Sequence, residues 1–141
     1  MVLTDCALNV LVTGASGQLG RSLRDSAANS PHHFIFSDLM QDEWTVSLDI
    51  TDPVAVAEAV KVHEADVIVN CAAYTDVNRA ETDVEKAALI NSYAPSGLAG
   101  AARDAGALLM HISTDYVFDG TSCVPYREDD PTSAVSVYGR T

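Results

Sequence analysis

Two hydroxyl side chains near the end of the chain have types and spacing suited to proton transfer. Thr114 follows the apolar residues 108–112, which predicts that it lies at a strand exit, and Tyr138 comes 24 residues later. In the reduction of a carbonyl, hydride comes from a nicotinamide and a proton must reach the developing alkoxide. We therefore predict that Thr114 and Tyr138 form a catalytic pair, the alternative being that Tyr138 is an ordinary loop residue.

The pKa of the phenol in such a pair must be lowered, because its ordinary value of about 10 makes proton exchange slow at neutral pH. A nearby ammonium group would lower this pKa. In sites of this layout a lysine usually stands four residues after the tyrosine, a position that would follow Thr141. We expect the 141-residue chain alone to show no useful reductase activity.

A glycine-rich loop follows the first predicted strand, residues 8–12, and precedes the first predicted helix, residues 18–28. Its glycines are Gly14, Gly17 and Gly20. Such a loop alone could be a plain turn, but here it has the strand-to-helix context of a dinucleotide-binding fingerprint. The amides of Gln18 and Leu19 would then join the glycines around a pyrophosphate at the helix N-terminus. The spacing is the wider form typical of short-chain reductases.

Aspartates end the next two predicted strands. Asp38, after residues 33–36, would bind the adenosine ribose hydroxyls and repel a 2′-phosphate. Asp49 and Ile50, after residues 45–48, would meet the adenine. Because no Lys or Arg lies in the glycine loop or just after Asp38, we predict binding of NADH or NADPH with NADH favoured. The alternatives are a solvated loop aspartate for Asp38 and a helix-entry loop for Asp49.

The exit of the fourth predicted strand, residues 66–70, carries small residues that would let a ribose and nicotinamide pass closely. These are Ala72 and Ala73, followed by Tyr74 and Thr75. Tyr74 is either a ligand or a packing residue. We expect Cys71 to be a small core residue and His111 to be buried inside its strand.

Strand-sized and helix-sized apolar patterns alternate along the chain, which predicts an α/β domain with a Rossmann-type doubly wound parallel sheet. We expect the strand order 3-2-1-4-5, a long helix over residues 81–105 bent near Pro95, and a turn-rich loop over 119–136. Residues 39–44 are too few for a helical crossover, so that connection should be irregular. Leu19 and Leu23 are expected to face inward from the first helix, and Val54, Ala57 and Val60 to line one face of the helix that Asp52 and Pro53 open. The apolar strand at 107–112 should form an edge able to associate.

Composition excludes several classes of protein. A net charge of −12 disfavours nucleic acid and acidic membranes. No apolar stretch is long enough to span a membrane, and three widely spaced cysteines fit a reducing cytoplasm better than disulfides or zinc. We predict no metal site, a cytoplasmic location and possible homo-oligomers.

Four segments together resemble the extended short-chain dehydrogenase/reductases, and most closely the dTDP-4-dehydrorhamnose reductase family. They are residues 12–20, 66–75, 113–120 and 125–128, within a resemblance that covers 8–141. The resemblance implies that Ile112 also touches the dinucleotide and that Thr114 and Asp115 touch the sugar. It implies NAD(P)H-dependent reduction of the 4-keto group of dTDP-4-dehydro-L-rhamnose, a nucleotide sugar. Asn78 departs from the aspartate expected there.

The same resemblance implies that residues 1–141 are an NAD(P)-binding domain that stops before the last strands and the C-terminal substrate-binding region. Two other functions stay open. One is an epimerase or dehydratase of the extended family, although dehydratases typically place acidic residues after the threonine and here only Asp115 follows. The other is a non-catalytic dinucleotide-binding regulatory subunit, since fold alone does not exclude it.

Overall fold

The structure is a computed structural model that describes residues 6–141, and its centre is a five-stranded parallel sheet. The strand order is β3-β2-β1-β4-β5, as predicted, so all strands end at one edge. The strands are β1 (Asn9–Thr13), β2 (His33–Asp38), β3 (Val46–Ser47), β4 (Val67–Asn70) and β5 (Leu108–His111). Every predicted strand is therefore present, with ends shifted by one or two residues.

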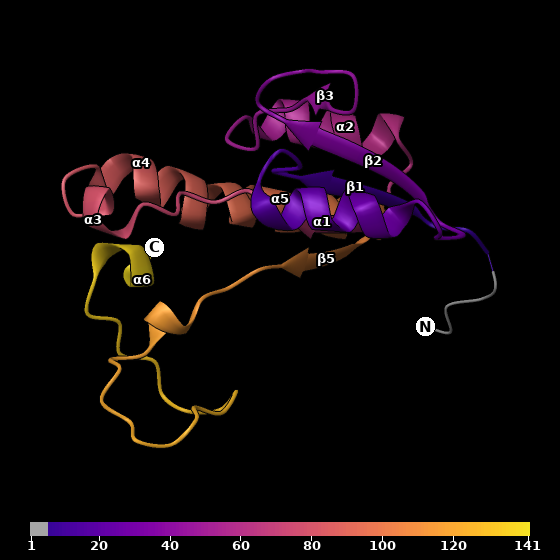
Figure 1. Ribbon diagram of the computed structural model, residues 1–141. Helices are drawn as coiled ribbons and strands as arrows, with labels where there is room; N and C mark the ends of the chain where they lie inside the picture. Colours follow the sequence, from indigo (N-terminus) through magenta and orange to yellow (C-terminus); the bar gives the residue numbers. More distant parts are fainter. Residues whose placement is uncertain (1–5) are drawn as a thin grey trace.

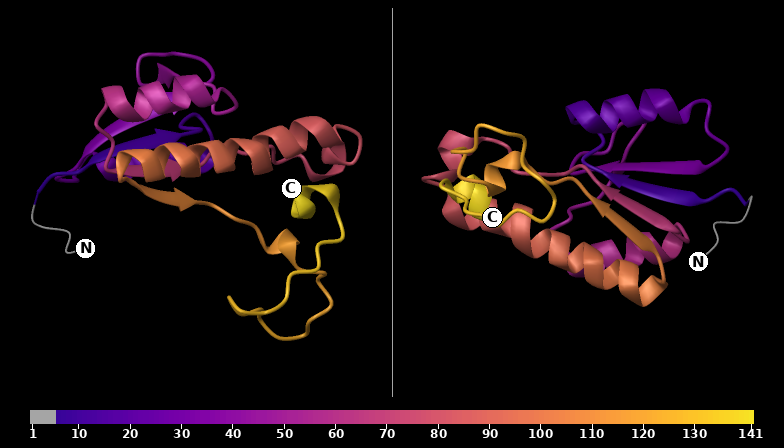
Figure 2. Two further views of the ribbon diagram at one scale, coloured as in Figure 1. Left: turned by 180° about the vertical axis from the view of Figure 1, so that it is seen from behind. Right: turned by 90° about the horizontal axis from the view of Figure 1, so that it is seen from below.

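Helices cover both faces of this sheet, which confirms the doubly wound arrangement (Figures 1 and 2). One face carries α1 (Gln18–Ala27), and the other carries α2 (Pro53–Val62) and α5 (Ala94–Ala105). The shorter elements are α3 (Val77–Ala80), α4 (Val84–Ala88), the π-helical η1 (Leu89–Tyr93), the 3₁₀ turn η2 (Asp115–Val117) and α6 (Val137–Arg140). Figure 1 shows η2, α6 and the loop between them hanging below the sheet and its helices.

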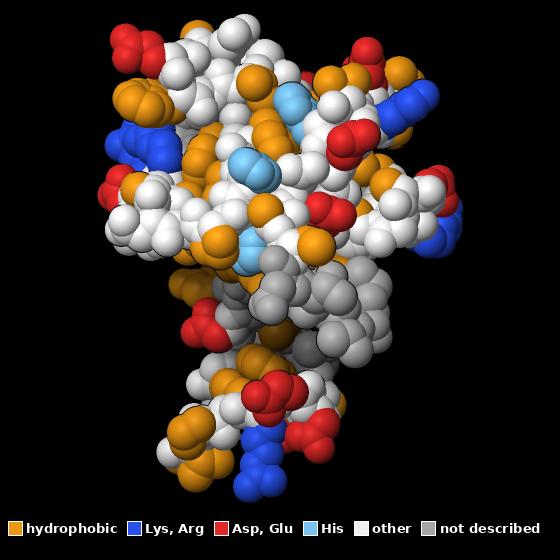
Figure 3. All heavy atoms as spheres, turned by 90° about the vertical axis from the view of Figure 1, so that its right-hand side faces the viewer, with side chains coloured by type: hydrophobic (Ala, Val, Ile, Leu, Met, Phe, Trp, Pro, Cys, Tyr) orange, Lys and Arg blue, Asp and Glu red, His pale blue; other side chains and the backbone are white. Residues whose placement is uncertain are grey.

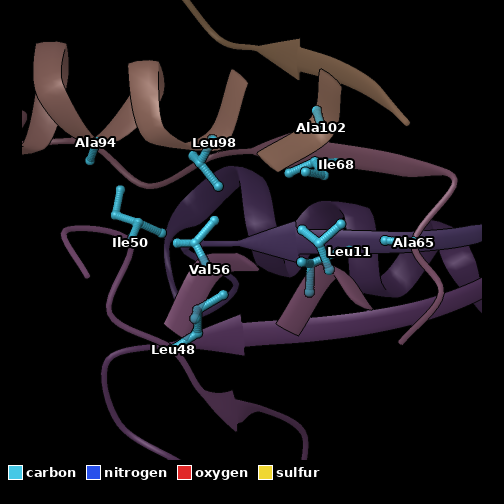
Figure 4. Packing of buried hydrophobic residues seen from close by; sticks show 10 residues of the cluster. Leu11, Leu48, Ile50, Val56, Ala65, Ile68, Ala94, Leu98 and Ala102 are labelled. Carbon is cyan, nitrogen blue, oxygen red and sulfur yellow. The ribbon is translucent and has the colours of Figure 1, made fainter. Parts of the chain in front are cut away.

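Side chains of alternate strand residues belong to two hydrophobic cores, one on each face of the sheet. Leu11 and Ile68 are fully buried against α2 and α5, where they meet Val56 and Leu98 (Figure 4). Val10, Val12 and Val69 face the other way, toward Leu23 on α1. Such two-sided burial is what makes the strands of a parallel sheet almost continuously apolar.

Some predicted inward-facing residues are on the surface instead. Leu19 is 40% exposed and Val54 is 73% exposed. Val54 lies in the first turn of α2, whose buried residues are Val56 and Val60, four positions apart. Of the face predicted for α2, Val60 is buried but Val54 and Ala57 are exposed, so the prediction was wrong in part. Hydrophobic spacing alone could not choose between two overlapping apolar stripes on so apolar a helix.

The helical run from 84 to 105 passes through one π-helical turn just before Pro95. Proline has no N–H, and its ring crowds the carbonyl of the residue four positions earlier, Asn91. Widening to η1 at Leu89–Tyr93 accommodates this crowding. The predicted irregularity near Pro95 is confirmed, and it displaces Asn91 from regular α-helical geometry.

The link between β2 and β3 is irregular, as predicted, and side-chain hydrogen bonds close it. Asp42 Oδ1 accepts from the amides of Trp44 (2.7 Å) and Thr45 (2.8 Å). These hydrogen bonds, led by that from the Trp44 amide, lower the pKa of Asp42. The guanidinium of Arg24 lies 5.7 Å from the centre of the Trp44 ring.

The surface around the sheet has two features of note. Within the described residues β5 pairs only with β4, and Leu108 and Met110 on it are about half exposed.

At the amino ends of the strands, histidines and apolar atoms lie near the middle of the face and the cations toward its rim (Figure 3). Across residues 6–141, no helix combines the length and apolar character needed to cross a bilayer.

Candidate active site

A row of four polar side chains crosses the carboxyl edge of the sheet. Ser37, Thr13, Asn70 and His111 are successive partners on β2, β1, β4 and β5. Thr13 Oγ1 donates to Asn70 Oδ1 at 2.6 Å, and Asn70 Nδ2 lies 3.0 Å from His111 Nδ1. The row is buried up to Asn70, but His111 is exposed, contrary to prediction, because β5 is the outer strand of the described sheet.

A pocket of about 380 Å³ opens beside the carboxyl ends of β1, β2 and β4. Ligands of doubly wound sheets bind in this place, where the strand order reverses. Its walls include seven of the predicted cofactor residues: Gly14, Gly17, Asp38, Asp49, Ile50, Ala72 and Ala73. Seven further lining residues were not predicted: Leu39, Leu48, Thr51, Cys71, Lys86, Leu89 and Ile90. Burial raises the pKa of the Cys71 thiol, which fits the predicted inert role.

The glycine loop has the shape required to approach a phosphate closely. Gly14 has φ +66°, and a Cβ there would lie 2.5 Å from the backbone nitrogen of Ala72. Gly17 is the N-cap of α1, and the helix start has no side-chain cap, whereas Asp52 caps α2 through two amides. The first-turn amides of α1 thus remain free of side-chain partners, the condition for anion binding at a helix N-terminus.

Asp38 is held across this loop by two backbone amides. Its Oδ2 accepts from Ser16 N–H at 2.9 Å and its Oδ1 from Leu39 N–H at 2.8 Å. Only one carboxylate oxygen of Asp49 has hydrogen-bond partners: Oδ1 accepts from the amide and the hydroxyl of Thr51. Both carboxylates line the same pocket, so each is placed to accept hydrogen bonds from a bound nucleoside.

Tyr74 lies beside the pocket but its side chain points elsewhere. The hydroxyl donates to Asp83 Oδ2 at 3.3 Å, and burial of the phenol together with the Asp83 carboxylate raises the pKa of Tyr74. Its backbone is held from both sides by Asn91, which accepts from the Tyr74 amide (2.8 Å) and donates to its carbonyl (3.0 Å). Asn91 was missed by sequence reasoning, and the signal was the proline four residues later.

A second pocket, of about 180 Å³, brings together Thr114, Tyr138 and Ile112 with Asn91 and His111. Thr114 caps η2, accepting from Tyr116 N–H at 3.3 Å, and Tyr138 packs edge-on against Tyr116 with ring centres 5.5 Å apart. Ala73 lines both pockets, so the two lie next to each other. Thr114 and Tyr138 therefore line a pocket beside the glycine-loop pocket.

Six predicted residues line neither pocket: Gln18, Leu19, Gly20, Tyr74, Thr75 and Asp115. Gly20 is buried, and a Cβ there would come within 2.5 Å of the Ala15 Cα, so it serves helix-to-strand packing. Asp115 lies next to the second pocket and accepts from the Thr114 hydroxyl at 3.4 Å. No group of three or more metal-ligating side chains occurs among residues 6–141.

The fold and the two adjacent pockets define a Rossmann-type domain of the short-chain dehydrogenase/reductase class. Comparison with known proteins narrows this class. The sequence model of the family described as "RmlD substrate binding domain" matches residues 8–141, and the chain belongs to that family. The resemblance noted from the sequence is thereby confirmed.

Relatives and solved structures agree with this placement. The chain is 42% identical over 134 residues to the dTDP-4-dehydrorhamnose reductase of Salmonella typhimurium, covering 95% of this chain and 44% of that protein. The dTDP-4-dehydrorhamnose reductase of Bacillus anthracis, solved in complex with NADP, has a TM-score of 0.88 and 33% identity over 96% of this chain and 46% of its own. A UDP-glucose-4-epimerase from Stenotrophomonas maltophila with bound NAD has a TM-score of 0.83 at 26% identity, covering 94% of this chain and 45% of that one.

The chain spans less than half the length of the curated relatives named here.

Proposed function

We propose that this chain binds a nicotinamide dinucleotide and supplies the proton-transfer pair for reduction of a nucleotide sugar. The reaction is NAD(P)H-dependent reduction of the 4-keto group of dTDP-4-dehydro-L-rhamnose to dTDP-L-rhamnose, carried out by the whole protein of which this chain forms at least a part. The observation that carries the proposal is that the pocket lined by Thr114 and Tyr138 adjoins the glycine-loop pocket, with Ala73 in the wall of both. Similarity to dTDP-4-dehydrorhamnose reductases supports the choice of substrate.

The residues present fit the dinucleotide. The open N-terminus of α1 and the bare backbone of Gly14 and Gly17 suit the pyrophosphate, while Asp38 and Asp49 suit the adenosine. The bound dinucleotide supplies a hydride. Thr114 holds the substrate oxygen by hydrogen bonding, and Tyr138 delivers a proton to it. Proton transfer by a positioned side chain contributes about 10²–10⁴-fold to rate.

NADH is the preferred form in this proposal. The Asp38 carboxylate, fixed by two amides, would repel a 2′-phosphate. Lys86 works against this preference, since it supplies an ammonium group to the same pocket. A cytoplasmic location fits the three cysteines, all of which are free.

Calorimetric titration with NADH and NADPH tests the binding step. The unchanged chain should bind NADH more tightly than NADPH, and Asp38→Asn should narrow that difference. Gly17→Val should remove binding of both, because its side chain would occupy the pyrophosphate site. Gly97→Ala, in α5 with open space around its Cβ position, is the matched control. Unchanged affinity of Gly17→Val would refute the assignment, and equal affinities of the unchanged chain for both cofactors would refute the preference.

The chemical step is tested in the full-length protein with dTDP-4-dehydro-L-rhamnose. Tyr138→Phe should lower kcat by about 10²–10⁴-fold while NADH affinity stays the same. Wild-type turnover of a UDP-sugar epimerisation in place of this reduction would favour the epimerase alternative. Binding of NADH without turnover of either substrate would favour a regulatory role.

A further inference from the structure

The helix that carries Tyr138 is held by hydrogen bonds more than by burial. α6 contains no buried residue, and the amides of its first turn have no partner within the helix. Ser136, the N-cap, accepts from Gly139 N–H at 3.0 Å. Val137 N–H donates to Glu81 Oε1 at 2.8 Å, across 56 residues of sequence. One carboxylate from a distant segment thus shares the capping of this helix with Ser136.

Glu81 is well placed to act as an anchor because its own backbone is fixed. It ends α3, where its N–H donates to Asn78 O at 3.3 Å and its neighbour Ala80 is completely buried. At the start of the same helix, Asp76 accepts from Arg79 N–H at 2.9 Å. The carboxylate therefore projects from a turn that is capped at one end and packed at the other.

The opposite side of α6 packs against the backbone of η2 at Tyr116. A Cβ at Gly139 would overlap the Tyr116 carbonyl oxygen, so only glycine lets α6 approach η2 this closely. Edge-on packing of Tyr138 against Tyr116 lies on the same side. The helix is thus held between η2 and the Glu81 carboxylate. Loss of the carboxylate would leave Val137 N–H unpaired, and the hydrogen bond from Asn91 Nδ2 to Thr141 Oγ1, at 3.4 Å, would remain at the other end of the helix.

We propose that Glu81 is a positioning residue for Tyr138: its carboxylate fixes the first turn of α6 and thereby where the phenol lies relative to Thr114. The proposal rests on the proposed function for its catalytic consequence, but its structural part stands on the Glu81–Val137 contact alone. Since a displacement of about 1 Å from productive geometry can cost about 10²-fold in rate, the effect should appear in kcat.

Two variants separate the hydrogen bond from the charge. Glu81→Gln keeps an oxygen acceptor at the same reach, and Glu81→Ala removes it. Glu85→Ala, on exposed α4 one helical turn further along, removes a carboxylate of the same kind and is the control. Amide hydrogen exchange at Val137 reports the contact directly, and thermal unfolding shows that each variant is folded.

In Glu81→Ala, exchange at Val137 should accelerate roughly tenfold, as expected for the loss of one hydrogen bond to a charged group. In the full-length protein kcat should fall about 10–10²-fold with little change in KM. Glu81→Gln should restore most of both, and Glu85→Ala should change neither. Equal Val137 exchange in all variants would overturn the proposal, as would a Gln variant as impaired as the Ala variant. Altered exchange in a protein without reductase activity would instead contradict the proposed function and leave the positioning contact established.

Discussion

Residues 9–111 and residues 112–141 are held in place by different kinds of contact. Every buried hydrophobic residue of the described chain lies between Val10 and Ala102. After β5, the chain relies on caps, turns and aromatic pairs, such as Phe118 stacked on Tyr126 at 4.1 Å. Yet the first region forms the glycine-loop pocket, and the second supplies Thr114 and Tyr138.

The difference implies two kinds of sensitivity to mutation. A pocket built on buried strands changes only when the core itself is disturbed, because packing there is dense and cooperative. A side chain held by a few hydrogen bonds and one close backbone approach can move without unfolding the domain. Core variants should therefore lower stability and binding together, whereas variants near Tyr138 should lower activity with little loss of stability.

The largest effect is expected from Gly14→Val. A left-handed residue other than glycine costs about 1–2 kcal/mol, and overpacking against the Ala72 backbone adds about 1–3 kcal/mol. Urea unfolding should show this loss, and NADH binding should disappear with it. Gly97→Ala should instead gain up to about 1 kcal/mol, since it replaces an unstrained helical glycine. If Gly14→Val matched the control, close approach at the glycine loop would not limit stability.

Gly139→Ala should show the opposite behaviour. The new methyl group would overlap the Tyr116 carbonyl and push α6 away, but no buried apolar contact would be lost. The urea midpoint should move little, whereas turnover by the full-length protein should fall toward that of Tyr138→Phe. Gly100→Ala, with open space at its Cβ position, should leave turnover unchanged. A large drop in stability would show that the segment after β5 is more tightly coupled to the core than its burial indicates.

The smallest effect is expected in the β2–β3 loop. This loop belongs to residues 9–111, but hydrogen bonds hold it in place, as they do in residues 112–141. The folded pKa of Asp42 lies below its ordinary value of 3.8, so its bonds to Trp44 and Thr45 favour the closed loop above that pH. This contribution is lost as pH falls through the lowered pKa. The fluorescence of Trp44, the only tryptophan, should therefore change reversibly below about pH 4. Asp42→Asn should remove this step, and a step that persisted in the variant would assign it to another group.

The sequence by itself predicted the parts that depend on near neighbours. Gly14 and Gly17 lie between β1 and α1, Asp38 ends β2 and Asp49 follows β3, because strand periodicity and glycine conformation are local properties. The irregular β2–β3 link followed from its length, and the bend before η1 and α5 followed from Pro95. The types and spacing of Thr114 and Tyr138 indicated a pair, and the alternation of strands and helices indicated the doubly wound sheet.

Only the tertiary structure decided which side chains from distant segments meet. Lys86 lines the glycine-loop pocket, Asn91 holds the Tyr74 backbone, and Glu81 caps the helix of Tyr138. The exposure of His111 likewise depends on β5 being the outer strand. No spacing in the sequence encodes these contacts, because each depends on how α3 to α5 pack against the sheet. Composition and periodicity indicate which segments form strands and helices, but the buried face of α2 and the residues that meet at the carboxyl edge are set by the assembled layers.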